Sequence, residues 1–164
     1  MWKPALLFKT ELEKQFAAQL YTTGWLYYSG YPYNGEIPKI EGRENLVQLA
    51  NVDVENLVRG YLSYTVDPMT DTVNRFGLYS FDPGNPGLGR DLLELMERLY
   101  STHARLEWSV VEGNPVKKHY DWFAKSKPVS FVHHFHACTK DLEGNLVGTY
   151  TYEVLNPDKC GGRV

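Results

Sequence analysis

The sequence is poor in cysteine and contains no long apolar run. Its two cysteines, Cys138 and Cys160, have no CxxC spacing and no neighbouring residues that would indicate a structural zinc site. We therefore interpret both as free thiols, as expected in a reducing compartment. No apolar run approaches the roughly 20 residues of a membrane-spanning helix, and the start, Met1 to Pro4, lacks a secretory signal core.

The sequence also lacks an excess of charge of one sign. Acidic and basic residues are mixed along the chain, and the formal net charge is −3. Without a basic patch there is no electrostatic footprint for nucleic acid. A chain of 164 residues, 43% of them hydrophobic, fits one folded domain over residues 1–164. We expect a soluble, cytoplasmic protein that binds neither a membrane nor nucleic acid.

Aromatic residues, by contrast, are abundant at 14% of the chain, with twelve tyrosines and four tryptophans. They gather most densely between Trp25 and Tyr33, where glycine and proline interrupt any regular period. Two interpretations of this stretch remain open. It is either a loop whose rings fill the edge of the core, or one wall of a pocket for a substrate.

Hydrophobic periodicity predicts helices and strands in a definite order. A first helix is expected from Thr10 to Tyr21, since Thr10 and Glu13 have the spacing of a capping box. Three strands joined by short turns should follow as an antiparallel meander: Leu46–Val52, Leu57–Val66 and Thr72–Phe81.

The second half continues with a helix whose apolar stripe runs from Leu88 to Leu99, and then with a strand, a helix and two strands. Their expected ranges are Arg105–Val111, Asn114–Ala124, Val129–Thr139 and Leu146–Leu155. The fold class predicted is α/β (α+β), with a mixed, mostly antiparallel central sheet flanked by helices.

The segment from Phe81 to Arg90 is rich in glycine and lies between a predicted strand and a predicted helix. Such a turn brings main-chain N–H groups close to a ligand, and the helix start faces an anion, so a phosphate is the natural partner. The turn ends in Gly89-Arg90-Asp91 and not in the Gly-Lys-Ser or Gly-Lys-Thr of a P-loop. The preceding strands are antiparallel, unlike those of a dinucleotide fold. A helix start without any ligand stays open as an alternative.

The same segment resembles the phosphate-binding signature of the GNAT superfamily of acyl-CoA N-acyltransferases, Gln/Arg-x-x-Gly-x-Gly/Ala. Gly87-Leu88-Gly89 matches its glycine pair, and the leucines after Arg90 match its helix opening, whereas Gly84 stands at the Gln/Arg position. The resemblance implies that acetyl-CoA is held, largely by main-chain amides, at Gly84, Asn85, Gly87, Leu88, Gly89 and Arg90.

A second resemblance covers Glu107 to Tyr120, where the family has a strand, an Asn-Pro helix start and then a tyrosine. It implies that Asn114 contacts the arm of CoA and that Tyr120 protonates the departing thiolate. The Gly-Phe that usually follows is absent, since Trp122-Phe123 stands there. From the residues alone, Tyr120 could equally be a core aromatic on the face of Phe123.

The family fold further implies a slot for the pantetheine. The strand before the glycine turn and the strand after the helix of the second motif should splay apart, and main-chain groups of Tyr79 and Phe81 should pair with the pantetheine amides.

The function expected is an N-acetyltransferase in which a small-molecule or peptide primary amine attacks acetyl-CoA directly, without a metal. His134 and His136 share a strand face, but two ligands are too few for a metal site, and one histidine or Glu107 could instead relay the proton of the amine. Two alternatives stay open: a catalytically silent CoA-binding or interaction module, and an enzyme that uses the same slot for a different acyl group. The resemblance also allows a homodimer formed through the last strands.

Overall fold

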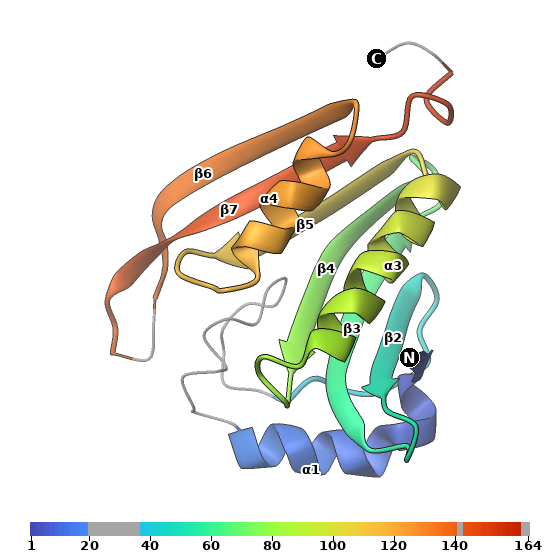
Figure 1. The fold of residues 1–164 in the computed structure, drawn as a ribbon, viewed down its shortest axis with the longest axis vertical. Helices are drawn as coiled ribbons and strands as arrows, with labels where there is room; N and C mark the ends of the chain where they lie inside the picture. The colour runs from blue at the N-terminus through green and yellow to red at the C-terminus, as the bar shows by residue number, and fades with distance from the viewer. Residues whose placement is uncertain (20–36, 141–142, 162–164) are drawn as a thin grey trace.

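A single twisted sheet forms the centre of the protein. The structure is a computed structural model that describes residues 1–19, 37–140 and 143–161. Its seven strands follow the order β1-β2-β3-β4-β5-β7-β6 (Figure 1). Their bounds are β1 Trp2–Pro4, β2 Leu46–Val52, β3 Val58–Asp67, β4 Thr72–Ser80, β5 Arg105–Val111, β6 Val129–Lys140 and β7 Leu146–Leu155.

All neighbouring strands are antiparallel except β4 and β5, which run parallel because α3 (Pro86–Thr102) connects them. The predicted mixed, mostly antiparallel sheet and the meander of β2, β3 and β4 are therefore confirmed. The aromatic stretch from Trp25 to Tyr33 lies outside the described residues.

Helices cover both faces of the sheet. α3 and α4 (Lys117–Lys125) pack on one face, and α1 (Lys9–Gln19), entered through the 3₁₀ turn η1 (Ala5–Phe8), packs on the other. Strand alternation explains the division, because Leu62 joins the core under α3 while its neighbour Tyr61 joins the core under α1. No helix within the described ranges is long and apolar enough to cross a membrane.

Three local expectations need correction. β1 was not expected, since three residues carry no readable period. α1 begins at Lys9, so Thr10 lies in its first turn and does not cap it, because η1 leads directly into the helix. α4 begins at Lys117, later than expected, since Asn114 accepts from the Val116 N–H at 2.9 Å within the turn that precedes the helix.

A β-bulge in β4 shapes the middle of the sheet. Arg75 has φ of 50°, and around it two residues of β4 oppose the single residue Tyr64 of β3. The register with β5 shifts at the same place, between Val73 and Phe76. An extra residue bends a strand and increases its twist, so β4 turns away from β5 immediately beyond the bulge.

Gly60 of β3 offers a test of how closely the elements near the glycine turn pack. A Cβ at Gly60 would lie 2.9 Å from the carbonyl oxygen of Tyr79 and 3.1 Å from a methyl group of Leu88. Gly60→Ala should therefore lower the free energy of unfolding by about 1–3 kcal/mol in chemical denaturation. Gly42→Ala is the control, because nothing lies within 4 Å of its Cβ. Equal stability of the two variants would show that β3, β4 and α3 can separate easily.

Candidate active site

The candidate site is the gap that opens between β4 and β5. Their parallel pairing ends at Phe76 and Trp108, although both strands continue. The splay was expected between β4 and the strand after the helix of the second motif, and this expectation is wrong. That strand is β6, at the far edge of the sheet, and β5 precedes the helix. The order of strands in the sheet decides which two strands flank the slot, and this order cannot be read from the sequence.

Beyond Phe76, β4 has one edge paired with β3 and one edge unpaired within the described part of the chain. The Phe81 N–H donates to the Arg59 carbonyl at 2.9 Å, so it faces β3. Since ladder bonds alternate along a strand, the main chain of Tyr79 also faces β3, in agreement with its carbonyl lying against Gly60. The main-chain groups that face the open edge are those of Leu78 and Ser80.

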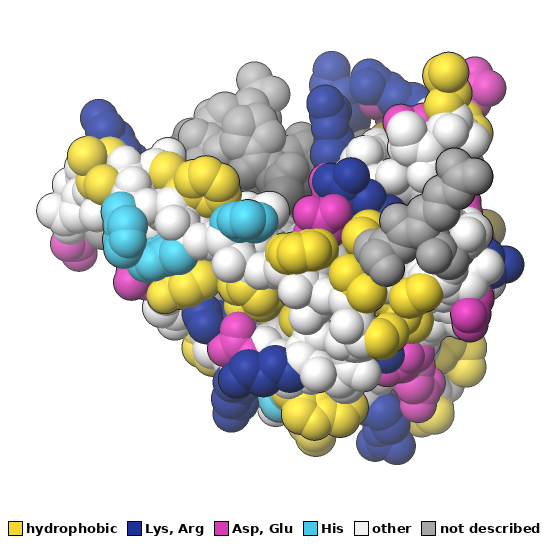
Figure 2. All heavy atoms as spheres, turned by 90° about the horizontal axis from the view of Figure 1, so that it is seen from above, with side chains coloured by type: hydrophobic (Ala, Val, Ile, Leu, Met, Phe, Trp, Pro, Cys, Tyr) yellow, Lys and Arg dark blue, Asp and Glu magenta, His cyan; other side chains and the backbone are white. Residues whose placement is uncertain are grey.

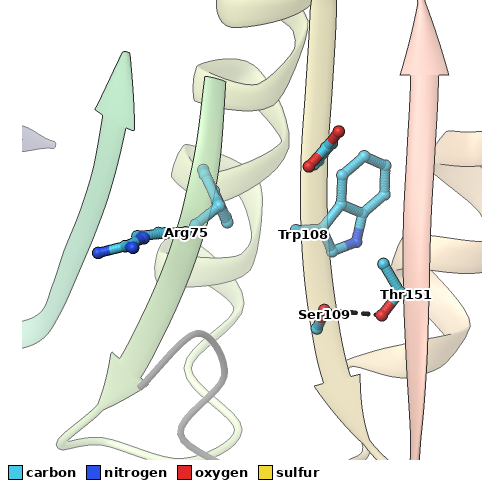
Figure 3. Close-up of a pocket in the computed structure, with 6 residues that line it drawn as sticks. Arg75, Trp108, Ser109 and Thr151 are labelled. Atoms are coloured by element: carbon cyan, nitrogen blue, oxygen red, sulfur yellow. Dashed lines mark hydrogen bonds between the residues drawn. The ribbon is translucent and has the colours of Figure 1, made fainter. Parts of the chain in front are cut away.

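Two buried polar atoms belong to the strands on either side of the gap, and the indole of Trp108 lies on the β7 side of β5, stacked on Tyr152 (Figure 3). The hydroxyl of Ser80 on β4 and the indole Nε1 of Trp108 on β5 are shielded from solvent and have no hydrogen-bond partner among the described residues. Buried polar groups are nearly always paired, so the Ser80 hydroxyl, on the strand whose edge is open, is a candidate for ligand contact. Neither residue was expected at the site, because a serine or a tryptophan within a strand belongs to no motif.

A small cavity marks the point where the strands diverge. Its volume is about 90 Å³, and it is lined by Arg75, Phe76, Glu107, Trp108, Ser109 and Thr151 (Figure 3). Ser109 and Thr151 share a hydrogen bond of 3.0 Å across β5 and β7 (Figure 3).

Two acidic side chains near this point form ion pairs with the same arginine. Glu107 and Glu153 are cross-strand neighbours, and Arg105 forms an ion pair with each of them, the second at 3.3 Å. Glu107 is thus an acidic group on the wall of a cavity that also contains hydroxyl groups.

Tyr120 of α4 lies beside the head of the gap. Its side chain is fully buried, and its ring centroid lies 5.8 Å from that of Trp108 and 6.0 Å from that of Tyr152. Because Trp108 is in the last β4–β5 pair, Tyr120 sits next to the place where the strands separate. This position fits both interpretations of Tyr120, as a core aromatic and as an acid at the slot.

A second tyrosine in the same aromatic cluster, Tyr152, already has a hydrogen-bond partner for its hydroxyl group. The hydroxyl of Tyr152 donates to Asp121 at 2.7 Å, and Lys117 lies 2.8 Å from the other oxygen of that carboxylate. Burial, and then the hydrogen bond to Asp121, raise the pKa of Tyr152 far above its ordinary value. Burial opposes ionisation of Asp121, but the hydrogen bonds from Lys117 and Tyr152 outweigh it and lower the pKa of this carboxyl group. The Tyr152 proton is therefore held by a carboxylate.

The glycine turn contains the N-cap of α3. Gly87 and Gly89 lie inside the helix, and it is Gly84 that has a positive φ, of 85°. Asn85 caps the helix, since its side-chain oxygen accepts from the N–H groups of Gly87 and Leu88 at 2.8 and 3.1 Å. The first helical residue is a proline, which has no N–H.

The residues predicted to bind phosphate therefore lie close together, but the main-chain N–H groups of Gly87 and Leu88 already donate to Asn85. Arg90 is exposed on α3 and forms no ion pair within the described ranges, so it remains accessible to an anion. Asn114 lies at the end of β5, on the other side of the gap, and its side-chain oxygen accepts from Val116.

The histidines of β6 are separated from β5 by the strand β7. The rings of His134 and His136 are 4.0 Å apart, and His134 stacks on Tyr150 and lies 3.7 Å from Glu112. Figure 2 shows histidine side chains grouped with apolar ones on this side of the molecule. Among the described residues no three potential ligands form a metal-binding group.

Comparison with solved structures identifies the fold. A GCN5-related N-acetyltransferase from Kribbella flavida superposes with a TM-score of 0.65, at 16% identity, over 95% of this chain and 97% of that chain. A spermidine/spermine N-acetyltransferase, SpeG, from Vibrio cholerae, in complex with manganese ions, gives a TM-score of 0.55 at 12% identity, over 73% of this chain and 71% of that one. The sequence matches no protein-family model and no curated protein. The chain has the GNAT fold, as the sequence resemblance implied.

Proposed function

We propose that this protein is an N-acetyltransferase that moves an acetyl group from acetyl-CoA to a primary amine. The observation that carries the proposal is the end of β4–β5 pairing at Phe76 and Trp108, next to a cavity and a buried tyrosine. A parallel pair that opens in this way offers an extended ligand a strand edge on which to pair.

The residues around the gap fit acetyl-CoA. The main chain of Leu78 and Ser80 would pair with the amides of the pantetheine, in place of Tyr79 and Phe81. The buried hydroxyl of Ser80, which has no hydrogen-bond partner among the described residues, would find one there. The diphosphate would lie at the start of α3, against Gly87, Leu88 and Gly89, with Gly84, Asn85 and Arg90 around it, and Asn114 would contact the arm from the far side of the gap.

Acetyl-CoA would supply an activated thioester carbonyl, and the chain would supply the proton transfers. The Tyr120 hydroxyl would give its proton to the sulfur as the carbon–sulfur bond breaks. Glu107, on the wall of the cavity, would take the proton that the attacking amine must lose. No step in this scheme uses a metal.

The acceptor should be a small molecule or peptide with a primary amine. The cavity that it would enter has the carboxylate of Glu107 and the hydroxyl groups of Ser109 and Thr151 on its walls, which suit an ammonium group. Spermidine is a reasonable first compound to test, because one protein of the same fold acts on it. The same proposal includes a cytoplasmic location and a homodimer. Light scattering measures the oligomeric state.

The second candidate is a CoA-binding or interaction module without transfer activity. Two departures from the family signature favour it: Gly84 stands at the Gln/Arg position, and Trp122-Phe123 stands where Gly-Phe is usual. The two candidates differ in one measurement. Both bind CoA, but only the enzyme releases thiol from acetyl-CoA when an amine is added.

We expect CoA and acetyl-CoA to raise the melting temperature of the protein. A ligand that binds only the folded state adds about 2.7 kcal/mol of stability at a hundredfold excess over its Kd. A thermal-shift titration measures this effect, with ATP and NAD as controls that share the phosphates but lack the pantetheine. Equal shifts with ATP would indicate a general phosphate site and would refute the CoA assignment.

A further inference from the structure

We propose that the acceptor is a primary amine attached to an aromatic or other apolar group, and that Phe131, His133 and Phe135 of β6 hold this group beside the cavity. The proposal rests on the proposed acetyl transfer and deepens it, because it names the class of amine. It extends the acceptor site from the cavity, across β7, to the edge of the sheet.

The register of the last three strands places residues of β6 on the face that carries the cavity. Ser109 of β5 pairs with Thr151 of β7, and Thr151 pairs with His133 of β6. Residues directly opposite each other in antiparallel strands point to the same face, so these three side chains form one row across the sheet. Ser109 and Thr151 line the cavity (Figure 3). The row therefore leads from the cavity to the edge strand.

Two exposed phenylalanines stand on either side of this row. Phe131 and Phe135 lie two residues before and two residues after His133, so all three side chains point to the same face of β6. Phe131 is 47% exposed and Phe135 is 53% exposed, and His133 between them is exposed as well. Figure 2 shows histidine side chains next to apolar ones on this side of the molecule. β6 thus presents an aromatic surface close to a polar cavity.

No helix in the described ranges packs on this face of β5, β7 and β6. The core under α1 takes its strand residues from β2, β3 and β4. The side chains that alternate with the row, such as Trp108 of β5 and Tyr152 of β7, belong to the core on the opposite face, under α3 and α4. A ligand can therefore reach the cavity and the aromatic surface of β6 from the same side.

The charges on this face favour an apolar amine over a polyamine. The carboxylates of Glu107 and Glu153 both form ion pairs with Arg105. Within the described parts of β5, β7 and β6, no other acidic residue has the register that points to this face. The cavity offers one ammonium group a carboxylate at Glu107, but the further ammonium groups of a polyamine would find none. An apolar group would instead find the exposed rings of β6.

Strand spacing sets the length of the amine. Neighbouring strands lie about 4.8 Å apart, so β5 and β6, with β7 between them, are separated by roughly 10 Å. 4-Phenylbutylamine can keep its nitrogen at the cavity while its ring contacts Phe131 or Phe135. The ring of benzylamine is too close to its nitrogen to reach β6.

Kinetics with a series of amines tests the proposal. Thiol release from acetyl-CoA gives kcat/KM for 4-phenylbutylamine, benzylamine, propylamine and spermidine. Calorimetry gives the affinity of the protein, saturated with CoA, for 4-phenylbutylamine. Because the ring is buried against β6, kcat/KM should be about 10- to 100-fold higher for 4-phenylbutylamine than for propylamine, with benzylamine between them.

Phe131→Ala and Phe135→Ala should each lower this preference about 3- to 10-fold, the usual scale of one aromatic contact, and should weaken the binding of 4-phenylbutylamine by a similar factor. Both side chains are exposed, so the variants should fold. Val132→Ala is the matched control. Val132 is 49% exposed on the same strand, but it pairs with Tyr152 and points to the opposite face. This variant should keep the preference of the natural protein.

A preference for spermidine, or equal kcat/KM for 4-phenylbutylamine and propylamine, would overturn the apolar class and leave acetyl transfer standing. A preference that Val132→Ala lowers as much as Phe131→Ala does would overturn the assignment to this face. Binding of 4-phenylbutylamine that is weakened in Phe131→Ala, without thiol release with any amine, would support the surface and refute the transfer. Neither binding nor thiol release with any of the four amines would refute both proposals.

Discussion

Replacing Tyr120 with phenylalanine should slow acetyl transfer by roughly 10²- to 10⁴-fold, the usual contribution of a general acid. The ring fills the same space beside Trp108 and Tyr152, so the packing of α4 on the sheet is retained. CoA affinity should change little, because the hydroxyl acts on the departing sulfur and not on the bound ground state. Thiol release from acetyl-CoA, measured with an amine panel, gives the rate.

Tyr152→Phe is the control for this experiment. It removes a hydroxyl from the same aromatic cluster, but one whose proton is held by Asp121 at 2.7 Å. We expect a loss of stability of about 1–3 kcal/mol, because Asp121 loses a partner, and a much smaller change in rate. If Tyr120→Phe turns over like the natural protein, Tyr120 is only a core aromatic and the acid lies elsewhere, while the binding proposal is untouched.

Gly89→Val should weaken CoA binding by about 10- to 100-fold, the range expected when hydrogen bonds to a charged group are lost. Gly89 lies within α3 and has no positive φ, so a branched side chain is not excluded by the backbone. Nothing lies within 4 Å of its Cβ position, so the variant should fold. The valine methyl groups would occupy the open region that the diphosphate needs.

Calorimetry with CoA measures the loss, and denaturation curves establish that the fold is intact. Gly89→Ala provides a smaller step in the same position and should give an intermediate affinity at equal or higher stability, since alanine favours a helix over glycine. A folded Gly89→Val protein with unchanged CoA affinity would place the phosphates somewhere other than the start of α3.

Much of the fold could be predicted from the sequence, because period and turn composition act locally. The stripe from Leu88 to Leu99 gave α3, and alternation in β2, β3 and β4 gave the meander. The helix α1 was expected within one residue of its start, but Thr10 does not cap it, because the turn η1 leads directly into Lys9.

The candidate site was less predictable. The glycine pair and Tyr120 follow from a resemblance of short motifs, but neither motif tells which strands flank the slot. Ser80 becomes a candidate only because burial leaves its hydroxyl without a described partner. The facing of main-chain groups in β4 likewise depends on the register with β3, which moves the proposed pantetheine contacts from Tyr79 and Phe81 to Leu78 and Ser80.

The sequence by itself determined the elements and the chemical character of the turn, because helix periodicity, glycine and proline act over a few residues. Only the tertiary structure decided where the sheet opens and which donors at the turn are engaged. The opening depends on a bulge at Arg75 and on β7 lying between β5 and β6, both of which are set by long-range pairing. The role of Asn85 was decided by the conformation of its side chain: the same carboxamide could contact a phosphate or cap the helix, and its bonds to Asp82 and to the N–H groups of Gly87 and Leu88 hold it as the cap.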